Sequence, residues 1–188
     1  RDRDSPLVVV AIRIADSDTA QVCLHGAVLG EGTVKSWEDS TYGQLGNGLT
    51  SKENTPVSVS NISTATAVSA GEMHACEVLT RGTVKCWGSG PYGQLGNGST
   101  SNQNTPVSVS NISTATSVSA QEFHTCAVLS GGTVKCWGDG SYGQLGNGLT
   151  SEYHTQVSVS SISAATSVPA GDRHTCAVLS GCTVKCWG

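Results

Sequence analysis

A stretch of 50 residues recurs along the chain, and this repetition limits the possible folds more than any other feature of the sequence. The four copies span residues 5–54, 55–104, 105–154 and 155–188, and the first is the most divergent. Repeats of this size are typical of solenoids and β-propellers, in which each unit packs on its neighbours. We therefore expect one repeat domain over residues 1–188.

Each full copy contains four short segments with strand character. In the third copy these are Val107–Ser110, Ala115–Ala120, His124–Ser130 and Thr133–Trp137. Gly-rich or polar turns separate them, and no helical period is present. Four strands in about 50 residues is the content of one propeller blade. The sequence therefore predicts an all-β fold, a β-propeller of four-stranded blades in about four repeats.

The cysteines test this strand register. If residues 130–132 form a three-residue loop whose last glycine is left-handed, Cys126 lies directly opposite Cys136, at a spacing that permits a disulfide. The first repeat has Gly26 and Ser36 at these positions, so both cysteines are lost together, as a bridge requires. Reduced cysteines in the core are the alternative. The predicted bridges are Cys76–Cys86, Cys126–Cys136 and Cys176–Cys186.

Two cysteines remain unmatched, Cys23 in the first repeat and Cys182 in the last. A closed ring or a head-to-tail contact would make these repeats neighbours, so a bridge between the two is a further hypothesis. Disulfides persist in oxidising compartments, and we therefore expect an extracellular, secreted protein. The chain begins at Arg1 rather than Met, which leads us to expect a processed product or a piece of a longer chain.

The two ends of the chain are complementary in strand content. The last repeat stops after its third strand, whereas residues 6–10 match the fourth strand of the other repeats. Bare sheet edges are liabilities that propellers remove by closure. We expect Leu7, Val8, Val9 and Val10 to complete the last blade, either of their own chain or of a neighbour by strand donation. Donation would build an oligomer or a filament.

Residues 124–148, HTCAVLSGGTVKCWGDGSYGQLGNG, resemble the repeat of the regulator of chromosome condensation family. Matching positions are Gly71, His74, Trp87, Gly88 and Gly93 to Gly96, with His124, Trp137, Gly138 and Gly143 to Gly146 one repeat on. The resemblance covers residues 15–188 and implies a propeller, although the family closes larger rings than four repeats supply. It includes an exchange factor for a small GTPase, a light receptor and a secreted inhibitor of β-lactamase. The paired cysteines resemble the secreted bacterial members.

Candidate chemistry in the repeat has a structural alternative in each case. His74, His124 and His174 lie two residues before a cysteine, which resembles a metal site, but a disulfide would consume the thiolates, so we expect structural histidines. The GQLGNG stretch lacks the Lys-Ser/Thr of a phosphate loop and is more typical of a turn. The Trp residues either form platforms on which sugars stack or, as we favour, pack one blade against the next. We expect no catalytic site, metal or cofactor.

Composition limits the partners. The net charge of −4 argues against a nucleic-acid surface, and no apolar run approaches the ~20 residues needed to span a bilayer. Asn61, Asn97 and Asn111 begin glycosylation triplets. These features favour a secreted, non-enzymatic scaffold that binds itself. A monomeric binder of glycans or of another protein, with variable loops such as Ser89–Pro91 against Asp139–Ser141 on one rim, is the alternative. A GTPase exchange factor is a third.

Overall fold

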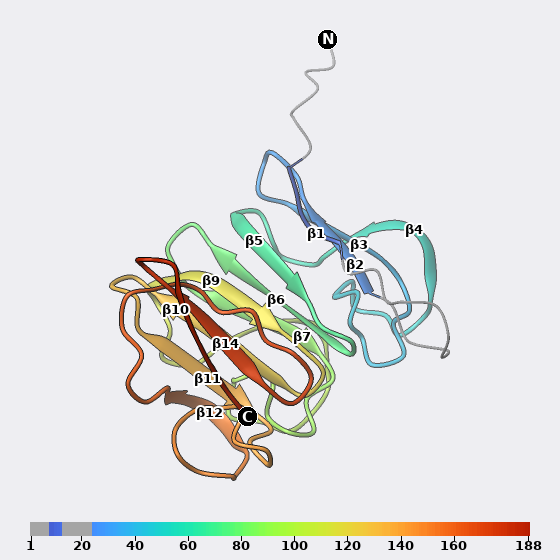
Figure 1. Cartoon of the computed structure of the whole chain (residues 1–188). Helices are drawn as coiled ribbons and strands as arrows, with labels where there is room; N and C mark the ends of the chain where they lie inside the picture. The colour runs from blue at the N-terminus through green and yellow to red at the C-terminus, as the bar shows by residue number, and fades with distance from the viewer. Residues whose placement is uncertain (1–7, 13–23) are drawn as a thin grey trace.

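The computed structural model describes residues 8–12 and 24–188, and within them every regular element is a β-strand (Figure 1). The strands form four antiparallel sheets that follow one another in chain order. The repeat sequence therefore gives a repeated structure, with one sheet for each 50-residue unit. The fold is an all-β propeller arrangement of four-stranded blades, as the sequence predicts.

The first two sheets contain four strands each. The first has the order β1 (Val8–Ile12), β2 (Leu24–Val28), β3 (Val34–Glu38) and β4 (Glu53–Ser58). The second has the order β5 (Ala65–Ala70), β6 (His74–Leu79), β7 (Val84–Gly88) and β8 (Gln103–Ser108). The fourth strand of each sheet carries the alternating PVS segment, so a sheet runs across the boundary between two sequence repeats.

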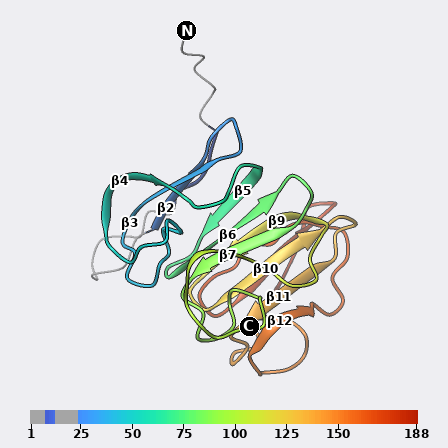
Figure 2. The same ribbon diagram turned by 180° about the vertical axis from the view of Figure 1, so that it is seen from behind.

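The third sheet repeats this order (Figures 1 and 2), and within the described residues the fourth sheet contains three strands. The third contains β9 (Ala115–Ala120), β10 (His124–Leu129), β11 (Val134–Gly138) and β12 (Tyr153–Ser158). The fourth contains β13 (Ala165–Ser167), β14 (Thr175–Leu179) and β15 (Thr183–Trp187). Pro169 stands where the second and third repeats have serine, and because it has no N–H to donate, β13 is short.

The hairpin register agrees with the prediction from the cysteines. Gly132 has a φ of 77°, in the left-handed region, and Cys126 lies opposite Cys136. The second and fourth sheets repeat this pairing. The structure joins the three expected pairs as disulfides: Cys76–Cys86, Cys126–Cys136 and Cys176–Cys186. Each bridge ties the two middle strands of one blade.

The hydrophobic core lies between neighbouring sheets, in three clusters that each draw residues from two blades. Trp87 and Trp137 are buried in two of these clusters. Their indole N–H groups donate to the main-chain oxygens of Gln44 and Gln94 in the preceding blade, both at 2.8 Å. The expectation that these tryptophans serve blade-to-blade packing is confirmed.

A buried chain of hydrogen bonds links the second blade to the third. The Thr125 hydroxyl donates to the Gln94 carbonyl oxygen at 2.8 Å, so its single proton is used. His74 Nε2, at 2.8 Å from the same hydroxyl, must therefore be the donor. His124 and Thr175 repeat this arrangement between the third and fourth blades, at 2.9 Å. These two histidines are structural, as expected.

The interface between the first two blades is built differently. Ala127 packs in one cluster with the Cys76–Cys86 bridge of the preceding blade. One repeat earlier its place is taken by Glu77, which is fully buried, and the preceding blade has Gly26 and Ser36 in place of the bridge. A Cβ on Gly26 would point to Val68, the cross-strand neighbour of Glu77. The larger Glu77 side chain thus faces Gly26 and Ser36, which are smaller than the disulfide in the other blades.

The N-terminal strand corrects one prediction. Val8–Ile12 forms β1 and pairs with β2, with Val8 opposite Val28, and does not lie along β15. By repeat alignment, the first strand of this sheet would include Asp18, which stands where the second repeat has the buried Val68. Residues 8–12 are more apolar than that segment and are therefore the better candidate for the first strand. Leu7 lies outside the described residues. Donation of this segment to a neighbouring chain stays a prediction.

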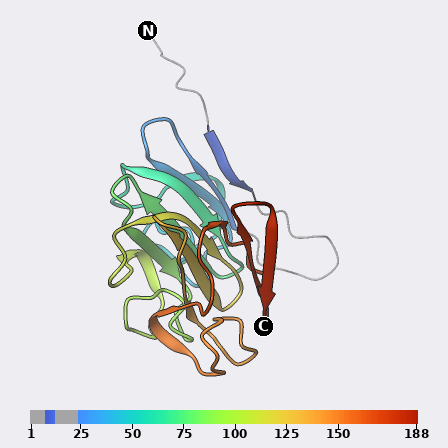
Figure 3. The same cartoon turned by 60° about the vertical axis from the view of Figure 1, so that its left-hand side comes forward.

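Strand β15 ends at the C-terminus as the outermost strand that the structure describes in the fourth sheet (Figure 3). β15 has no partner on its outer side among residues 8–12 and 24–188, and Val184 is 59% exposed. The equivalent Val134 is 1% exposed, because the next blade covers it. Cys186 is likewise exposed, whereas Cys86 and Cys136 are fully buried.

Candidate functional site

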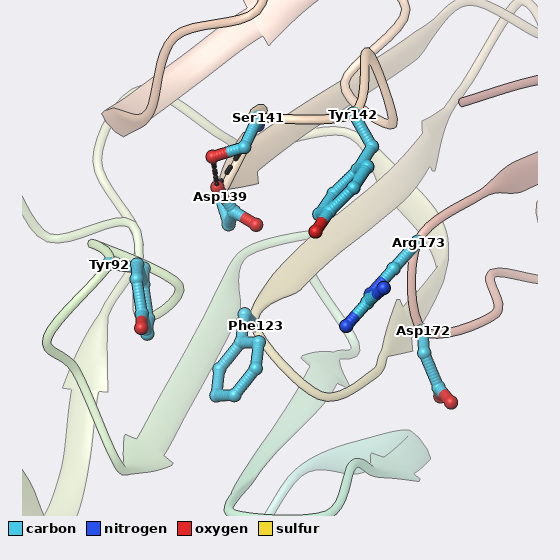
Figure 4. A pocket seen from close by; sticks show the side chains of 7 residues that line it. All are labelled: Tyr92, Phe123, Asp139, Ser141, Tyr142, Asp172 and Arg173. Carbon is cyan, nitrogen blue, oxygen red and sulfur yellow. Dashed lines mark hydrogen bonds between the residues drawn. The ribbon is translucent and has the colours of Figure 1, made fainter.

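A pocket of about 240 Å³ opens on one rim, where loops of the second, third and fourth blades meet (Figure 4). Two loops that follow a third strand and two turns that precede a second strand supply its walls. The lining residues are Tyr92, Phe123, Asp139, Ser141, Tyr142, Asp172 and Arg173. The pocket therefore exists only when consecutive blades stand side by side.

The loop after β11 is held in shape by its own side chains. The Asp139 carboxylate accepts hydrogen bonds from the Ser141 N–H at 3.0 Å and from its hydroxyl at 2.6 Å. It also accepts one from Gln144 Nε2 at 2.9 Å, and the Gln144 oxygen accepts the Tyr142 N–H at 2.8 Å. These bonds fix the backbone on which Tyr142 stands, so the tyrosine is presented from a rigid loop.

Two pairs of planar groups form the walls. The rings of Tyr92 and Phe123 lie 4.8 Å apart between centroids, at a tilt of 51°. The Arg173 guanidinium lies over the Tyr142 ring, 4.7 Å from its centroid, a cation–π contact. Both pairs join a tyrosine to the residue 31 positions later, in the turn of the next blade. Tyr142 is 52% exposed and Tyr92 38%, so both rings remain open to a ligand.

The equivalent loop of the second blade has lost part of this frame. Ser89 replaces the aspartate and Pro91 replaces the serine, which removes both the acceptor and one N–H donor. Gln94 Nε2 is consequently buried without a hydrogen-bond partner. The Gly90 N–H instead donates to the Asn102 side chain at 3.0 Å. The variable stretches 89–91 and 139–141 thus differ, and of them Asp139 and Ser141 line the pocket.

The buried histidines stay neutral and outside the pocket lining. Burial lowers the pKa of His74 to about 3, with His124 acting in the same direction. Burial lowers the pKa of His124 to about 4, although Asp139 raises it. His174, whose equivalents these are, is exposed. Among the described residues, no three His, Cys, Asp or Glu side chains gather as a metal site would require.

The remaining predicted site residues are scattered. Asn61 and Asn111 are exposed at turns with φ of 56° and 48°, and Asn97 is half-buried, its side chain accepting the Ser99 N–H. Cys182 is exposed in the β14–β15 loop and forms no disulfide with any other cysteine that the structure describes. Its proposed partner Cys23 lies outside the described residues, so that bridge stays a prediction.

The sequence profile described as the regulator of chromosome condensation (RCC1) repeat matches residues 31–78, 81–128 and 131–178. A second profile of the same description matches residues 65–94 and 115–144. The chain belongs to the RCC1 repeat family. By sequence, no curated protein matches the chain.

Several solved structures share this fold. Human WBSCR16 superposes with a TM-score of 0.77 at 19% identity, over 88% of this chain and 44% of its own. Yeast RCC1 (Prp20), solved bound to Kap60, gives 0.79 at 17% identity, over 100% and 45%. The ectodomain of the receptor kinase CR4 from Physcomitrella patens gives 0.54 at 22% identity, over 88% and 39%. The chain therefore spans less than half the length of these proteins.

Sequence reasoning missed Phe123 and Arg173 as members of the site. Both occupy the position before the repeated histidine, where the second repeat has Met73. In the last three copies this position changes while the next residue is always histidine, and that contrast was the available signal. A variable side chain on a repeated frame is typical of a recognition surface. The RCC1 repeat here thus supplies a scaffold on which the residue before the repeated histidine differs from blade to blade.

Proposed function

We propose that the protein is a secreted, non-enzymatic interaction module of the RCC1 repeat family, and that its rim pocket holds the ligand. The observation that carries this is the pair of exposed tyrosines on rigid loops, each set against a residue that varies between blades. Exposed aromatic rings beside a few polar groups are typical of binding sites. The three disulfides support an extracellular location.

The test is a binding screen on the non-reduced protein, with small panels of sugars and of peptides observed by NMR. The Tyr142→Ala variant removes an exposed ring from the pocket and should leave the fold intact. Tyr42→Ala is the matched control, because Tyr42 occupies the same repeat position but does not line the pocket. Ligand binding that Tyr142→Ala abolishes and Tyr42→Ala keeps supports the proposal. Equal binding by all three proteins contradicts it.

Self-assembly is a second candidate, favoured by the uncovered face of the last blade. Val184 and Cys186 are exposed there, although their equivalents in the second and third blades are buried. A sheet edge of this kind pairs readily with another strand. Light scattering over a range of concentrations should show species above 19.2 kDa that Val184→Lys reduces. Leu149→Lys, at an exposed loop leucine, is the control. A monomer at every concentration contradicts assembly.

Glycosylation is proposed at the exposed triplets. Asn61 and Asn111 stand at turns open to solvent, whereas the Asn97 side chain is engaged with Ser99. Secretion from a glycosylating host should therefore add glycans at Asn61 and Asn111 in preference to Asn97. Intact mass before and after enzymatic deglycosylation, compared with Asn→Gln variants, measures the occupancy. No mass change on deglycosylation rules out the modification.

A further inference from the structure

We propose that the rim pocket is a carbohydrate site that takes one neutral hexose unit, such as the terminal sugar of a glycan. This inference rests on the proposed function, since it names the ligand class of the same pocket. Three features of the described residues lead to it: the size of the pocket, the disposition of its aromatic rings and the balance of its charges. Each excludes a different competing ligand.

Size and shape come first. A volume of about 240 Å³ is below the usual ~300–1,000 Å³ of sites for drug-sized ligands, and it has room for a single sugar ring. Figure 4 shows Tyr92 and Phe123 on one side and Tyr142 with Arg173 on the other, with the space between them open. A pyranose has one face of C–H groups, which removes apolar surface from water when it covers an aromatic ring.

The charges favour a neutral ligand. The lining residues include Asp139, Asp172 and Arg173, so residues of both charge signs surround one small space. A lysine or arginine side chain entering the pocket would approach the Arg173 guanidinium. A free carboxylate or phosphate would approach the two aspartates. A hydroxyl-rich neutral ring avoids both repulsions and can accept from a guanidinium and donate to carboxylate oxygens.

Hydrogen-bonding capacity remains at the pocket wall. The Ser141 hydroxyl donates its proton to Asp139, so its oxygen lone pairs are available to accept from a sugar hydroxyl. Asp139 is 8% exposed, and its carboxylate accepts a hydrogen bond from Gln144. This bond orients the carboxylate, so the side chain need not move when a ligand binds. Groups fixed before binding lose little conformational freedom when the ligand arrives. The polar side of the pocket is thus preorganised.

The equivalent positions one blade earlier lack this combination. Met73 stands 31 residues after Tyr42 and offers neither an aromatic ring nor a guanidinium, although Asp39 keeps the same loop frame. The chain therefore presents one such site among the described blades rather than a repeated series. A single shallow sugar site predicts weak binding, with a dissociation constant on the order of 1 mM.

The experiment is saturation-transfer NMR on the non-reduced protein with a defined set of probes. The neutral probes are the methyl glycosides of glucose, galactose, mannose and N-acetylglucosamine. Glucuronate and a lysine-rich peptide represent the anionic and cationic classes. We expect at least one neutral glycoside to bind, and Phe123→Ala and Tyr142→Ala each to weaken it by about 10-fold or more, as the loss of a stacking ring implies. Tyr42→Ala should bind as the unaltered protein does. Thermal unfolding of each variant shows whether it remains folded.

The outcomes separate the sugar proposal from the proposed function. Binding of the peptide or of glucuronate alone, sensitive to Phe123→Ala, discards the neutral sugar and keeps the pocket as the ligand site. Binding of a glycoside that neither pocket variant affects places the sugar elsewhere and overturns the inference. No binding by any probe overturns it as well, and the light-scattering test of the β15 edge then decides whether the protein acts by assembly. If one variant fails to fold, the other still decides the outcome.

Discussion

His74 of the second blade donates a hydrogen bond from Nε2 to the hydroxyl of Thr125 in the third, over 2.8 Å and with both side chains fully buried. Thr125 in turn donates to the Gln94 carbonyl, which also accepts from Trp137. One carbonyl oxygen thereby joins two blades through three side chains. The same set recurs 50 residues later with His124, Thr175 and Gln144.

Replacement of Thr125 by valine should destabilise the fold by about 1–3 kcal/mol, because valine keeps the shape but leaves the His74 N–H buried without an acceptor. Such an orphaned donor costs more than the loss of an average hydrogen bond. Urea unfolding of the non-reduced protein measures the change. Thr100→Val is the control, since Thr100 is exposed and should change stability by less than about 0.5 kcal/mol. Equal midpoints for the two variants would show that the buried bond contributes nothing.

Stability should fall as the pH rises towards 8 because of Glu77. Burial raises the pKa of this carboxyl from 4.5 to about 8, with Lys85 opposing. A raised folded-state pKa gives a contribution that is complete below pH 4.5 and is lost as the pH rises through 8. We expect Glu77→Gln to reduce the loss of unfolding free energy between about pH 5 and 8.5, by an amount on the order of a few kcal/mol.

Two buried histidines change the stability with pH in the opposite direction to Glu77. The comparison of pH profiles must separate their effect from that of the carboxyl. His74 and His124 have lowered pKa values, so their contribution is complete above pH 6.5 and is lost as the pH falls towards 4 and 3. The unaltered protein and the Glu77→Gln variant both retain these histidines, so the difference between their pH profiles isolates the carboxyl. Parallel profiles over the same pH range would mean that Glu77 is ionised in the folded protein.

The double substitution Ser89→Asp with Pro91→Ser should stabilise the second blade. It restores the loop sequence that lets Asp139 bind Ser141 and Gln144 in the third blade, and gives the orphaned Gln94 Nε2 an acceptor. The gain expected from satisfying one buried donor is about 1 kcal/mol. Thermal or urea unfolding measures it. Ser89→Asp alone should give less, and a double variant no more stable than the starting protein would contradict the reasoning.

The three disulfides should be reduced in a fixed order. Cys86 and Cys136 are fully buried, whereas Cys186 is exposed on the last blade, so a reductant reaches the Cys176–Cys186 bridge first. Stepwise reduction, alkylation and mass spectrometry should label Cys176 and Cys186 at the lowest reductant concentration. Cys182 is exposed and forms no disulfide with another described cysteine, so its labelling without reductant would contradict a bridge to Cys23. Simultaneous labelling of all three bridges would indicate that reduction follows global unfolding.

The blade was predictable from sequence because its signals are local. A left-handed glycine in the 130–132 loop fixes the hairpin, and from it the pairing of Cys126 with Cys136 follows by counting. The loss of both cysteines from the first repeat supports the same register. These inferences need only the two strands that a short loop joins.

The N-terminal strand and the pocket were less predictable because they depend on contacts between blades. Residues 6–10 match a fourth strand by sequence, but the structure uses Val8–Ile12 as a first strand, and strand identity by repeat alignment gave no warning of this. Phe123 and Tyr92 meet across 31 residues, from loops of different sheets. Phe123 and Tyr92 meet because neighbouring blades lie side by side, and the sequence does not specify the distance between blades.

The unequal fit between Gly26 and Glu77 bears on how a gene for this chain can change its number of repeats. Residues 55–104 and 105–154 share 37 of 50 positions, and similar neighbouring repeats invite slippage during replication. Loss of the second unit would set Gly26 and Ser36 against Ala127 and leave a void. Its duplication would press Glu77 against a disulfide. Either event places mismatched surfaces between neighbouring blades. The repeats are therefore inherited as one ordered set, even though each could be copied alone.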